Sequence, residues 1–465
     1  MTQLGADRLD VLRAEVDGAV CVPGDAGFAE ACNIWNGAIT RRPSVVVRCL
    51  GPGDVAAALR HARGEGLEVS VRGGGHGFSG AALCEGGLTI DLSLMRSVEI
   101  DPEGKRATCG GGVTWAELDG AAQQHGLAVP GGFISHTGIA GLTLGGGMGW
   151  LTRHAGLSCE NLVGAEVVVP DGRILRASES EHPDLFWAIR GGGGNFGVVT
   201  SFEFRLTAVG PFVQLGLFFF PPDQGKEMFR FARDYVETLP SDCGTFIGAL
   251  NAPPEPFVPE EYQLQPGYAL VVVGFGDEAG HAQMIAPIRA SLSPAFELVT
   301  PMPYVALQQM FDPSAPWGIL GYEKAVYLDD MTDGAIDVLT THFPKKASPL
   351  SFVPIFSLGG AYRSAAPDAV AFGGSRATRW VVNLAAVAPT AELLEADTAW
   401  VRAFWSDLVR HASGVGSYVN FMSEYDEDRV RASYGAERYA RLAAIKALYD
   451  PDNVLHLNAN IKPTG

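Results

Sequence analysis

A glycine-rich segment with a histidine at its centre is the part of the chain that most directly offers chemistry. VRGGGHGFSG (Val71–Gly80) ends a stretch that is typical of a strand. Consecutive glycines let backbone N–H groups turn toward one point, which makes a nest for a phosphate. We expect Arg72 to add positive charge at the rim of this nest, and His76 to lie beside whatever the phosphate carries. A turn histidine bonded only to backbone is an equally good interpretation of His76 from the motif alone.

The G-x-G-x-x-G pattern of dinucleotide-binding folds occurs twice, over Gly75–Gly80 and over Gly192–Gly197. In those folds the glycine loop follows a strand and opens a helix whose N-terminus faces the pyrophosphate. The first pattern is followed by a loop and a strand, and the second follows the helix-like LFWAIR. We therefore reject both as Rossmann motifs, and a nicotinamide-dependent dehydrogenase is the least favoured function.

The composition is that of a globular chain without an affinity for polyanions. The 465 residues carry 34 Lys and Arg against 52 Asp and Glu, a formal net charge of −18. Nucleic acids and anionic membrane surfaces attract basic patches, so we expect neither as a partner. No stretch reaches the ~20 apolar residues of a membrane span.

The cysteines and the first residues indicate the compartment. Seven cysteines are scattered without a C-x-x-C pair, which predicts neither a metal site nor a disulfide framework. The first twenty residues contain acids and no long apolar core, so they do not read as a signal peptide. We expect reduced thiols and a cytoplasmic protein.

The character of the chain changes near Thr207. Before it, short strands (43–49, 67–71, 88–93) alternate with helices, one capped by Asp54 and one opened by a Thr114–Glu117 capping box, and a hairpin turns at Asp171-Gly172. After it come longer apolar strands (214–220, 268–275, 350–358, 380–388) and helical stretches (224–238, 390–411), with a Pro- and Glu-rich surface loop over 251–266. These patterns predict an α+β fold whose second part has a mainly antiparallel sheet, followed by a C-terminal helix over 436–449.

Five motifs in a fixed order resemble a known family. They are Val71–Gly80, GLTLGGGMGWLTRHAGLSCENL (Gly141–Leu162), DLFWAIRGGGGNFGVVTSFEF (Asp184–Phe204), YVNF (Tyr418–Phe421) and YDPDNVLHLNANIKP (Tyr449–Pro463). Together they look like the berberine-bridge-enzyme branch of the vanillyl-alcohol-oxidase superfamily of FAD-linked oxidases. NIWNGAITRRPSVVVRCL (Asn33–Leu50) is especially similar to the bacterial members.

The resemblance implies the architecture. It implies an FAD-binding domain of two α+β subdomains (1–206), a central substrate-binding domain built on an antiparallel sheet (207–412), and a C-terminal segment (413–465) that returns to complete the FAD domain. The strand 350–358 is then expected in the wall of the substrate pocket.

The resemblance also implies the cofactor and its contacts. His76 matches the histidine that bonds covalently to the flavin, and Ile134 stands where many members have a second, cysteine link, so we expect one covalent bond. The other residues expected to contact FAD are Arg72, Gly73, Gly74, Gly75, Gly77, Ser79, Thr137, Gly138, Gly141, Gly145, Gly146, Gly149, Val198, Asn420 and Asn458.

The catalytic base is not assigned by the resemblance. The tyrosine that several members use is Phe421 here, and SFVPIFSLGGAYRS contains no acid to match the glutamate that other members use. Tyr418, His136 and Thr137 are the candidates that remain.

The expected function is an FAD-dependent oxidase. A small or medium secondary metabolite or heterocycle would give a hydride to the flavin, and O2 would become H2O2. The alternatives are an oxygenating flavoprotein of a polyketide or other natural-product pathway, and a flavin-binding protein with little turnover. The expected partners are the small substrate and O2, with the protein as a monomer or homodimer.

Overall fold

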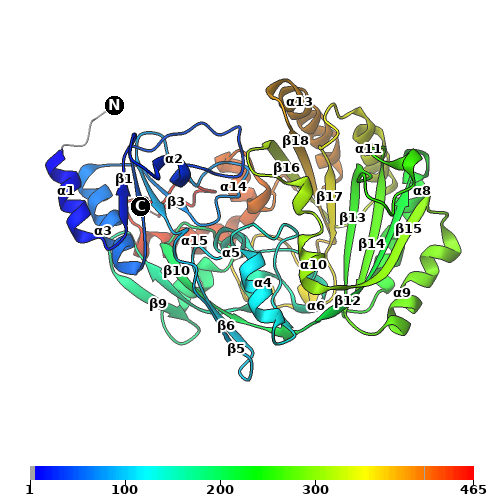
Figure 1. Ribbon diagram of the computed structural model, residues 1–465, viewed down its shortest axis with the longest axis horizontal. Helices are drawn as coiled ribbons and strands as arrows, with labels where there is room; N and C mark the ends of the chain where they lie inside the picture. Colours follow the sequence, from blue (N-terminus) through cyan, green and yellow to red (C-terminus); the bar gives the residue numbers. More distant parts are fainter. Residues whose placement is uncertain (1–5, 413, 465) are drawn as a thin grey trace.

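A computed structural model describes residues 6–412 and 414–464 of the chain. Figure 1 shows two bodies side by side. The N-terminal half of the chain and its C-terminal end build one body, and the green to orange segment between them builds the other. The fold is α+β, as expected.

A four-stranded sheet carries the glycine-rich segment. Its order is β1 (Ala19–Cys21), β2 (Val45–Arg48), β4 (Leu88–Asp91), β3 (Val69–Arg72), and β2 and β3 both run parallel to β4. Parallel strands need a crossover, and α3 (Pro52–Glu65) provides it between β2 and β3. The prediction that Asp54 caps α3 is wrong, because the helix begins two residues earlier. The Asp54 carboxylate instead accepts from the N–H groups of Asp17, Gly18 and Leu50.

A second, antiparallel sheet packs beneath it. Its order is β5 (Val98–Asp101), β6 (Arg106–Gly110), β10 (Val198–Arg205), β8 (Leu162–Val168), β9 (Ile174–Ser178). The predicted hairpin is confirmed as β8 and β9. The predicted capping box is confirmed too, since Glu117 accepts from the Thr114 N–H at 2.9 Å as α4 (Trp115–Gln123) begins.

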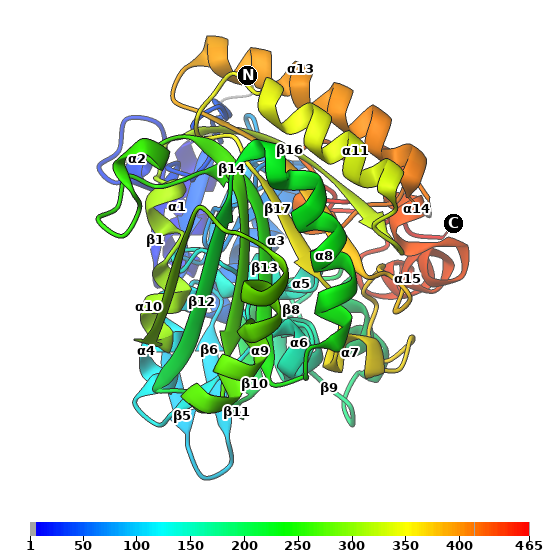
Figure 2. The ribbon, with the colours of Figure 1, turned by 90° about the vertical axis from the view of Figure 1, so that its right-hand side faces the viewer.

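The central body is a seven-stranded, fully antiparallel sheet. Its order is β15 (Phe296–Pro303), β12 (Phe212–Phe220), β14 (Pro266–Gly274), β13 (Cys243–Asn251), β17 (Val353–Ser357), β18 (Trp380–Ala388), β16 (Leu320–Leu328). One face packs against α8 (Gly225–Thr238), α9 (Glu278–Ser291), α11 (Asp333–His342) and α13 (Ala391–Leu408), which lie in front of it in Figure 2. The other face is turned toward the first body.

The C-terminal end returns to the first body. α14 (Glu427–Tyr434) and α15 (Ala436–Tyr449) lie there in Figure 1, and α15 packs on α7 (Pro183–Ile189) in a shared core. The buried Lys446 Nζ is 2.6 Å from an Asp450 carboxylate oxygen and donates to the Asn195 and Leu455 carbonyls. This places the last motif against the glycine-rich segment around Asn195.

Shorter elements connect these layers. They are α1 (Ala6–Glu15), α2 (Phe28–Ala31), β7 (Leu127–Ala128), α5 (Ile139–Gly145), α6 (Thr152–Ala155), η1 (Ser158–Asn161), β11 (Thr207–Ala208), η2 (Pro222–Gln224), η3 (Glu260–Tyr262), α10 (Tyr304–Gln309), η4 (Asp312–Ser314), η5 (Phe343–Lys345), α12 (Ala361–Ser364), η6 (Val409–His411) and η7 (Val419–Phe421). None of the helices in the described residues is long and apolar enough to cross a membrane.

Candidate functional site

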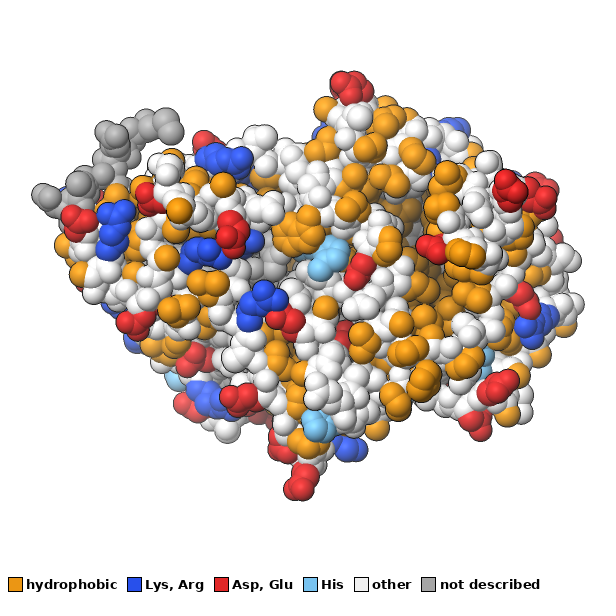
Figure 3. All heavy atoms as spheres, in the orientation of Figure 1, with side chains coloured by type: hydrophobic (Ala, Val, Ile, Leu, Met, Phe, Trp, Pro, Cys, Tyr) orange, Lys and Arg blue, Asp and Glu red, His pale blue; other side chains and the backbone are white. Residues whose placement is uncertain are grey.

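A cavity of about 1100 Å³ lies between the two bodies. Its walls come from the glycine segments of the first body, the C-terminal segment, and the open face of the central sheet. Hydrophobic side chains surround a hollow in this region in Figure 3. Ordinary ligand pockets measure about 300–1,000 Å³, so this cavity has room for a cofactor and a substrate together.

The glycine loop after β3 forms one wall and is built to hold an anion. No backbone N–H from Gly73 to Phe78 has a hydrogen-bond acceptor among the described residues, although Gly73–Ser79 all line the cavity. A Cβ on Gly74 would lie 2.4 Å from the Gly138 nitrogen, so the two loops touch through their backbones. This arrangement of free donors fits the phosphates of a dinucleotide.

His76 stands in this loop with two aromatic neighbours. Its ring stacks on Trp35 with centroids 4.7 Å apart, and its Nε2 lies 3.1 Å from Nδ1 of His136. Burial, with a contribution from the His136 ring, lowers the pKa of His76 to about 3. The imidazole is therefore uncharged at neutral pH. Nδ1 makes no hydrogen bond to another described residue.

Several residues expected to contact the cofactor do not line this cavity. The Arg72 guanidinium does not line the cavity, because Nη1 contacts the buried Asp91 carboxylate at 3.2 Å, although its Nε lies 3.3 Å from where a Cβ on Gly75 would be. Gly145 and Gly146 make room for Asn420 and Phe372, and Gly149 touches the Gly131 carbonyl. Val198 is in the core beneath the four-stranded sheet. These residues support the walls without lining the cavity.

The remaining expected residues line the cavity, with one exception. His136 does not line the cavity, but its Nδ1 contacts His76, which does. The expected residues that line the cavity are Gly73, Gly74, Gly75, His76, Gly77, Ser79, Thr137, Gly138, Gly141, Tyr418, Asn420 and Asn458. The Asn458 Oδ1 is buried without a hydrogen-bond partner among the described residues, so it is an acceptor left for a ligand.

The Tyr418 hydroxyl accepts two hydrogen bonds from its surroundings. The donors are the Gly147 N–H at 2.7 Å and Asn420 Nδ2 at 2.8 Å. Burial raises the pKa of Tyr418 above its ordinary value. The phenol is therefore poorly suited to take a proton at neutral pH.

A glutamate on the central sheet was missed by the sequence reasoning. Glu323 of β16 and Asn383 of β18 line the cavity, both buried, and Asn383 Nδ2 donates to Glu323 Oε2 at 2.8 Å. The other oxygens, Glu323 Oε1 and Asn383 Oδ1, have no partner among the described residues. Burial raises the pKa of Glu323 to about 8. The segment around β17 contains no acid, as the sequence shows, and the buried glutamate of this sheet comes from β16 instead.

Two further parts of the wall were also missed. Gly193, Gly194 and Asn195 line the cavity beside Asn458, although the motif that contains them gave no expected contact residue among these three. The stretch Asn251–Glu255, expected as a plain surface loop, borders the cavity at the end of β13.

Trp35 and Asn36 hold the glycine loop against the central sheet. Asn36 Nδ2 donates to the Phe78 carbonyl at 2.7 Å and to the Gly321 carbonyl at 2.9 Å, while Asn36 Oδ1 accepts from the Gly321 N–H. Trp35 Nε1 donates to the Ala315 carbonyl at 2.9 Å. The loop of His76 and the strand of Glu323 are thereby joined through one short segment.

The thiols lie away from the cavity. Ile134 is in its wall, but all seven cysteines are free, buried and absent from the lining. Burial raises the pKa of Cys159 far above its ordinary value, so this thiol is kept protonated.

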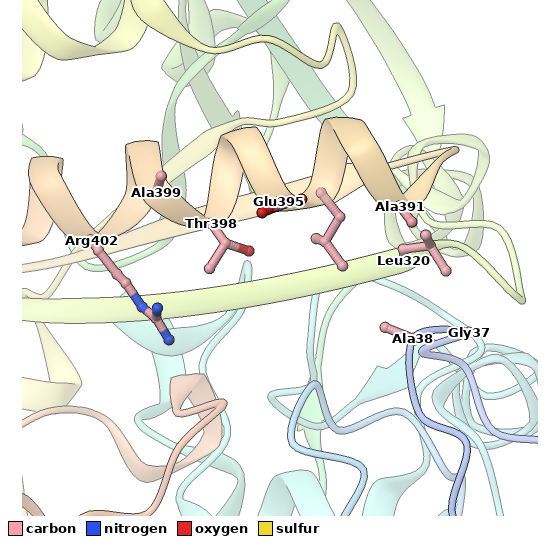
Figure 4. A pocket seen from close by; sticks show the side chains of 9 residues that line it. Gly37, Ala38, Leu320, Ala391, Glu395, Thr398, Ala399 and Arg402 are labelled. Atoms are coloured by element: carbon pink, nitrogen blue, oxygen red, sulfur yellow. The ribbon is translucent and has the colours of Figure 1, made fainter.

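A second hollow lies on the outer surface between α13, β16 and Gly37–Ala38 (Figure 4). Its charged lining residues are Glu395 and Arg402, and Arg402 is already paired with Glu424 at 2.7 Å. The residues lining it include none of the sequence motif residues, apart from Gly37 and Ala38. In the described residues no group of three or more His, Cys, Asp or Glu side chains is placed to hold a metal ion.

Comparison with known proteins decides the family. Residues 43–178 match the model of an FAD binding domain, and residues 417–462 match the berberine and berberine-like model. The chain is 32 % identical to (R)-6-hydroxynicotine oxidase of Paenarthrobacter nicotinovorans, over 97 % of this chain and 98 % of that protein. The protein belongs to the berberine-bridge-enzyme-like family of FAD-linked oxidoreductases.

Solved structures agree with this assignment. The crystal structure of 6-hydroxy-D-nicotine oxidase from Arthrobacter nicotinovorans superimposes with a TM-score of 0.86 at 29 % identity, over 97 % of this chain and 98 % of that one. The berberine-bridge-enzyme-like protein 1 of Physcomitrella patens superimposes with a TM-score of 0.88 at 21 % identity, over 98 % and 99 %, which shows the shared fold. The protein is thus an FAD-linked oxidoreductase of an oxidase family that acts on small molecules.

Proposed function

We propose that the protein is an FAD-dependent oxidase that holds its flavin through one covalent bond to His76. FAD, when bound, accepts a hydride from the substrate and passes the electrons to O2, which becomes H2O2. The observation that carries the proposal is a neutral histidine in a loop of free N–H donors, on the wall of a cavity that continues to an apolar sheet.

His76 would hold the flavin by a bond from Nδ1 to its 8α-methyl carbon. That bond would replace a C–H bond of the methyl group, the imidazole would lose its N–H proton, and the two electrons released would go to the flavin and from there to O2. Nε2 is occupied by His136, whereas Nδ1 makes no hydrogen bond to another described residue. The uncharged ring is the nucleophilic form, and its low pKa keeps it uncharged throughout the physiological range. His136 and the stacked Trp35 fix the ring orientation.

Glu323 is the group that we propose to take the proton from the donor atom of the substrate. It lies where the central sheet meets the C-terminal segment. Its backbone N–H donates to Ser423 Oγ at 2.8 Å, and the next residue, Lys324, forms an antiparallel β-bridge with Met422. Its free Oε1 and its raised pKa are what a general base near neutral pH requires.

The oxidase activity is tested by reoxidation. Photoreduced protein mixed with air should regain the oxidised spectrum within seconds and release one H2O2 per flavin, and turnover in air should release one H2O2 per substrate consumed. Reoxidation that takes many minutes and needs an added acceptor contradicts the proposal in favour of a dehydrogenase. A peroxide yield well below one, with oxygen found in the product, contradicts it in favour of the oxygenating flavoprotein.

A further inference from the structure

The central-sheet half of the cavity has a wall of one chemical character. Leu215, Leu217, Phe246, Val271, Phe352 and Phe356 all face into it. They come from neighbouring strands of one sheet and from the segment that leads into β17, so they form a continuous apolar surface. A ligand that lies on this surface gains free energy by burying apolar area, and these six side chains offer it no polar group.

The charges of the cavity have one sign. In the described part of the chain, the acidic and basic lining residues are Glu255, Glu323 and His76, with neither a lysine nor an arginine. Glu255 is exposed at the end of the Asn251–Glu255 stretch, whereas Glu323 is buried. His76 is uncharged, so no cationic group in the lining can compensate an anionic ligand.

Two polar points interrupt the apolar wall: Asn251 at the end of β13, whose Oδ1 is buried without a partner among the described residues, and the Glu323–Asn383 pair. The Glu323–Asn383 pair leaves two buried oxygens, Glu323 Oε1 and Asn383 Oδ1, without donors among the described residues. Lys324, the next residue on β16, is directed away, since its Nζ lies over the Trp405 ring and is 3.5 Å from Glu424. Buried acceptors without partners cost free energy unless a ligand supplies the donors.

We propose that this half of the cavity binds an apolar molecule that carries one hydrogen-bond donor, an amine or a hydroxyl, and no anionic group. The donor lies at Glu323 and Asn383, and the rest of the molecule lies along the apolar wall. This inference rests on the proposed function, because it takes the central-sheet half as the substrate half. Carboxylates are excluded because no lysine or arginine among the described lining residues can compensate their charge, and oligosaccharides by a wall that leaves their many hydroxyls unpaired.

The test compares ligands that share one ring system. Binding of naphthalen-2-ylmethanol, naphthalen-2-ylmethanamine and 2-naphthoate to the flavin-loaded protein is measured by calorimetry under argon, with cellobiose as the sugar. We expect the alcohol and the amine to bind, 2-naphthoate to bind at least about tenfold more weakly, and cellobiose to give no binding. An amine that binds at least about tenfold tighter than the alcohol identifies a cation as the donor, and equal affinities identify an uncharged donor.

Two variants distinguish the contribution of Glu323 from that of the apolar surface. Glu323→Gln should remove most of the difference between the amine and 2-naphthoate, and Leu217→Arg should strengthen 2-naphthoate. Equal binding of 2-naphthoate and the alcohol, preference for cellobiose, or no binding of any probe to folded, flavin-loaded protein overturns the inference. Failure of the proposed function is seen separately, as a protein without acid-stable flavin.

Discussion

His76 and Glu323 owe their chemistry to burial acting in opposite directions on a base and on an acid. Burial disfavours the charged form of either group, so it lowers the pKa of His76 to about 3 and raises that of Glu323 to about 8. At neutral pH both side chains are mainly uncharged before a ligand arrives. A nucleophile and a base are thereby placed in one cavity without an ion pair between them.

Replacing Glu323 should remove a pH dependence as well as rate. A base must be ionised, so the rate of anaerobic flavin reduction should rise as pH increases through about 8 and level off above it. In Glu323→Gln the rise should vanish, and the rate at high pH should fall by about 10²–10⁴. Stopped-flow absorbance of the flavin across pH 6–10 measures both effects.

Glu424→Gln is the matched control for this prediction. Glu424 lies next to Ser423, which contacts the Glu323 backbone, but its side chain is half-exposed and paired with Arg402. It should leave the profile unchanged. An unaltered profile in Glu323→Gln would assign the base elsewhere.

The sequence predicts some residues of the site and misses others for identifiable reasons. Consecutive glycines around His76 have one plausible use, so the nest could be inferred from residue types alone. Arg72 looks free in the sequence, but the pairing of β3 with β4 places it opposite Asp91. Glu323 sits in the charged-looking GYEKAVY, and only the two-residue alternation of a strand separates it from Lys324.

At the scale of elements, the segment Trp35–Asn36 connects the glycine loop of His76 to strand β16 of the central sheet. Asn36→Ala should leave the Phe78 and Gly321 carbonyls and the Gly321 N–H short of partners, and each unsatisfied buried group costs about 1–3 kcal/mol. We expect a lower free energy of unfolding in urea and a smaller fraction of covalently held flavin. Asn33→Ala, at an exposed position of the same segment, should change neither quantity. Equal behaviour of the two variants would refute the linking role.

Successive side chains of β17 point to opposite faces of the sheet, so substrate binding and stability can be tested at neighbouring residues. Phe356 faces the cavity and stacks on Phe421, while Ile355 faces the helices on the other side of the sheet. Phe356→Leu should change the KM for substrate several-fold with an unaltered flavin spectrum. Ile355→Val should cost about 1 kcal/mol of stability and leave KM unchanged. Loss of flavin from Phe356→Leu would contradict the assignment of this wall to the substrate.

At the scale of the whole molecule, a buried polar contact joins the two bodies. Gln308 of α10 donates to the Asp119 carboxylate of α4 at 2.8 Å, and both side chains are buried. Burial raises the pKa of Asp119 to about 7. Between about pH 4 and pH 7 the unfolded chain is ionised at this residue and the folded chain is not, so this group lowers stability as the pH rises.

Asp119→Asn should remove that loss. The variant should match the wild type in stability near pH 4, gain on it up to about pH 7, and keep a constant advantage of at most about 4 kcal/mol above. Urea unfolding of both proteins from pH 4 to pH 9 measures the difference. A difference that does not grow with pH would show that Asp119 is ionised in the folded protein.

The overall organisation was largely predictable, whereas the cavity was not. The change of composition near Thr207 marks the start of the long central strands, and the Asn-rich ending marks the returning tail. The strand order β15-β12-β14-β13-β17-β18-β16 has no signal in the sequence, because it is set by packing between distant segments. We propose 1–206, 207–412 and 413–465 as the functional division of the chain.

Acid precipitation followed by peptide mass analysis is the measurement that decides whether a single bond joins His76 to the flavin. We expect a yellow pellet, a peptide containing His76 that carries the full mass of FAD, and a colourless pellet from His76→Ala. Ile134 gives the second link no thiol, so the cysteine peptides should be unmodified. Flavin that leaves the wild-type protein entirely in acid, or a cysteine peptide that also carries it, would contradict the claim.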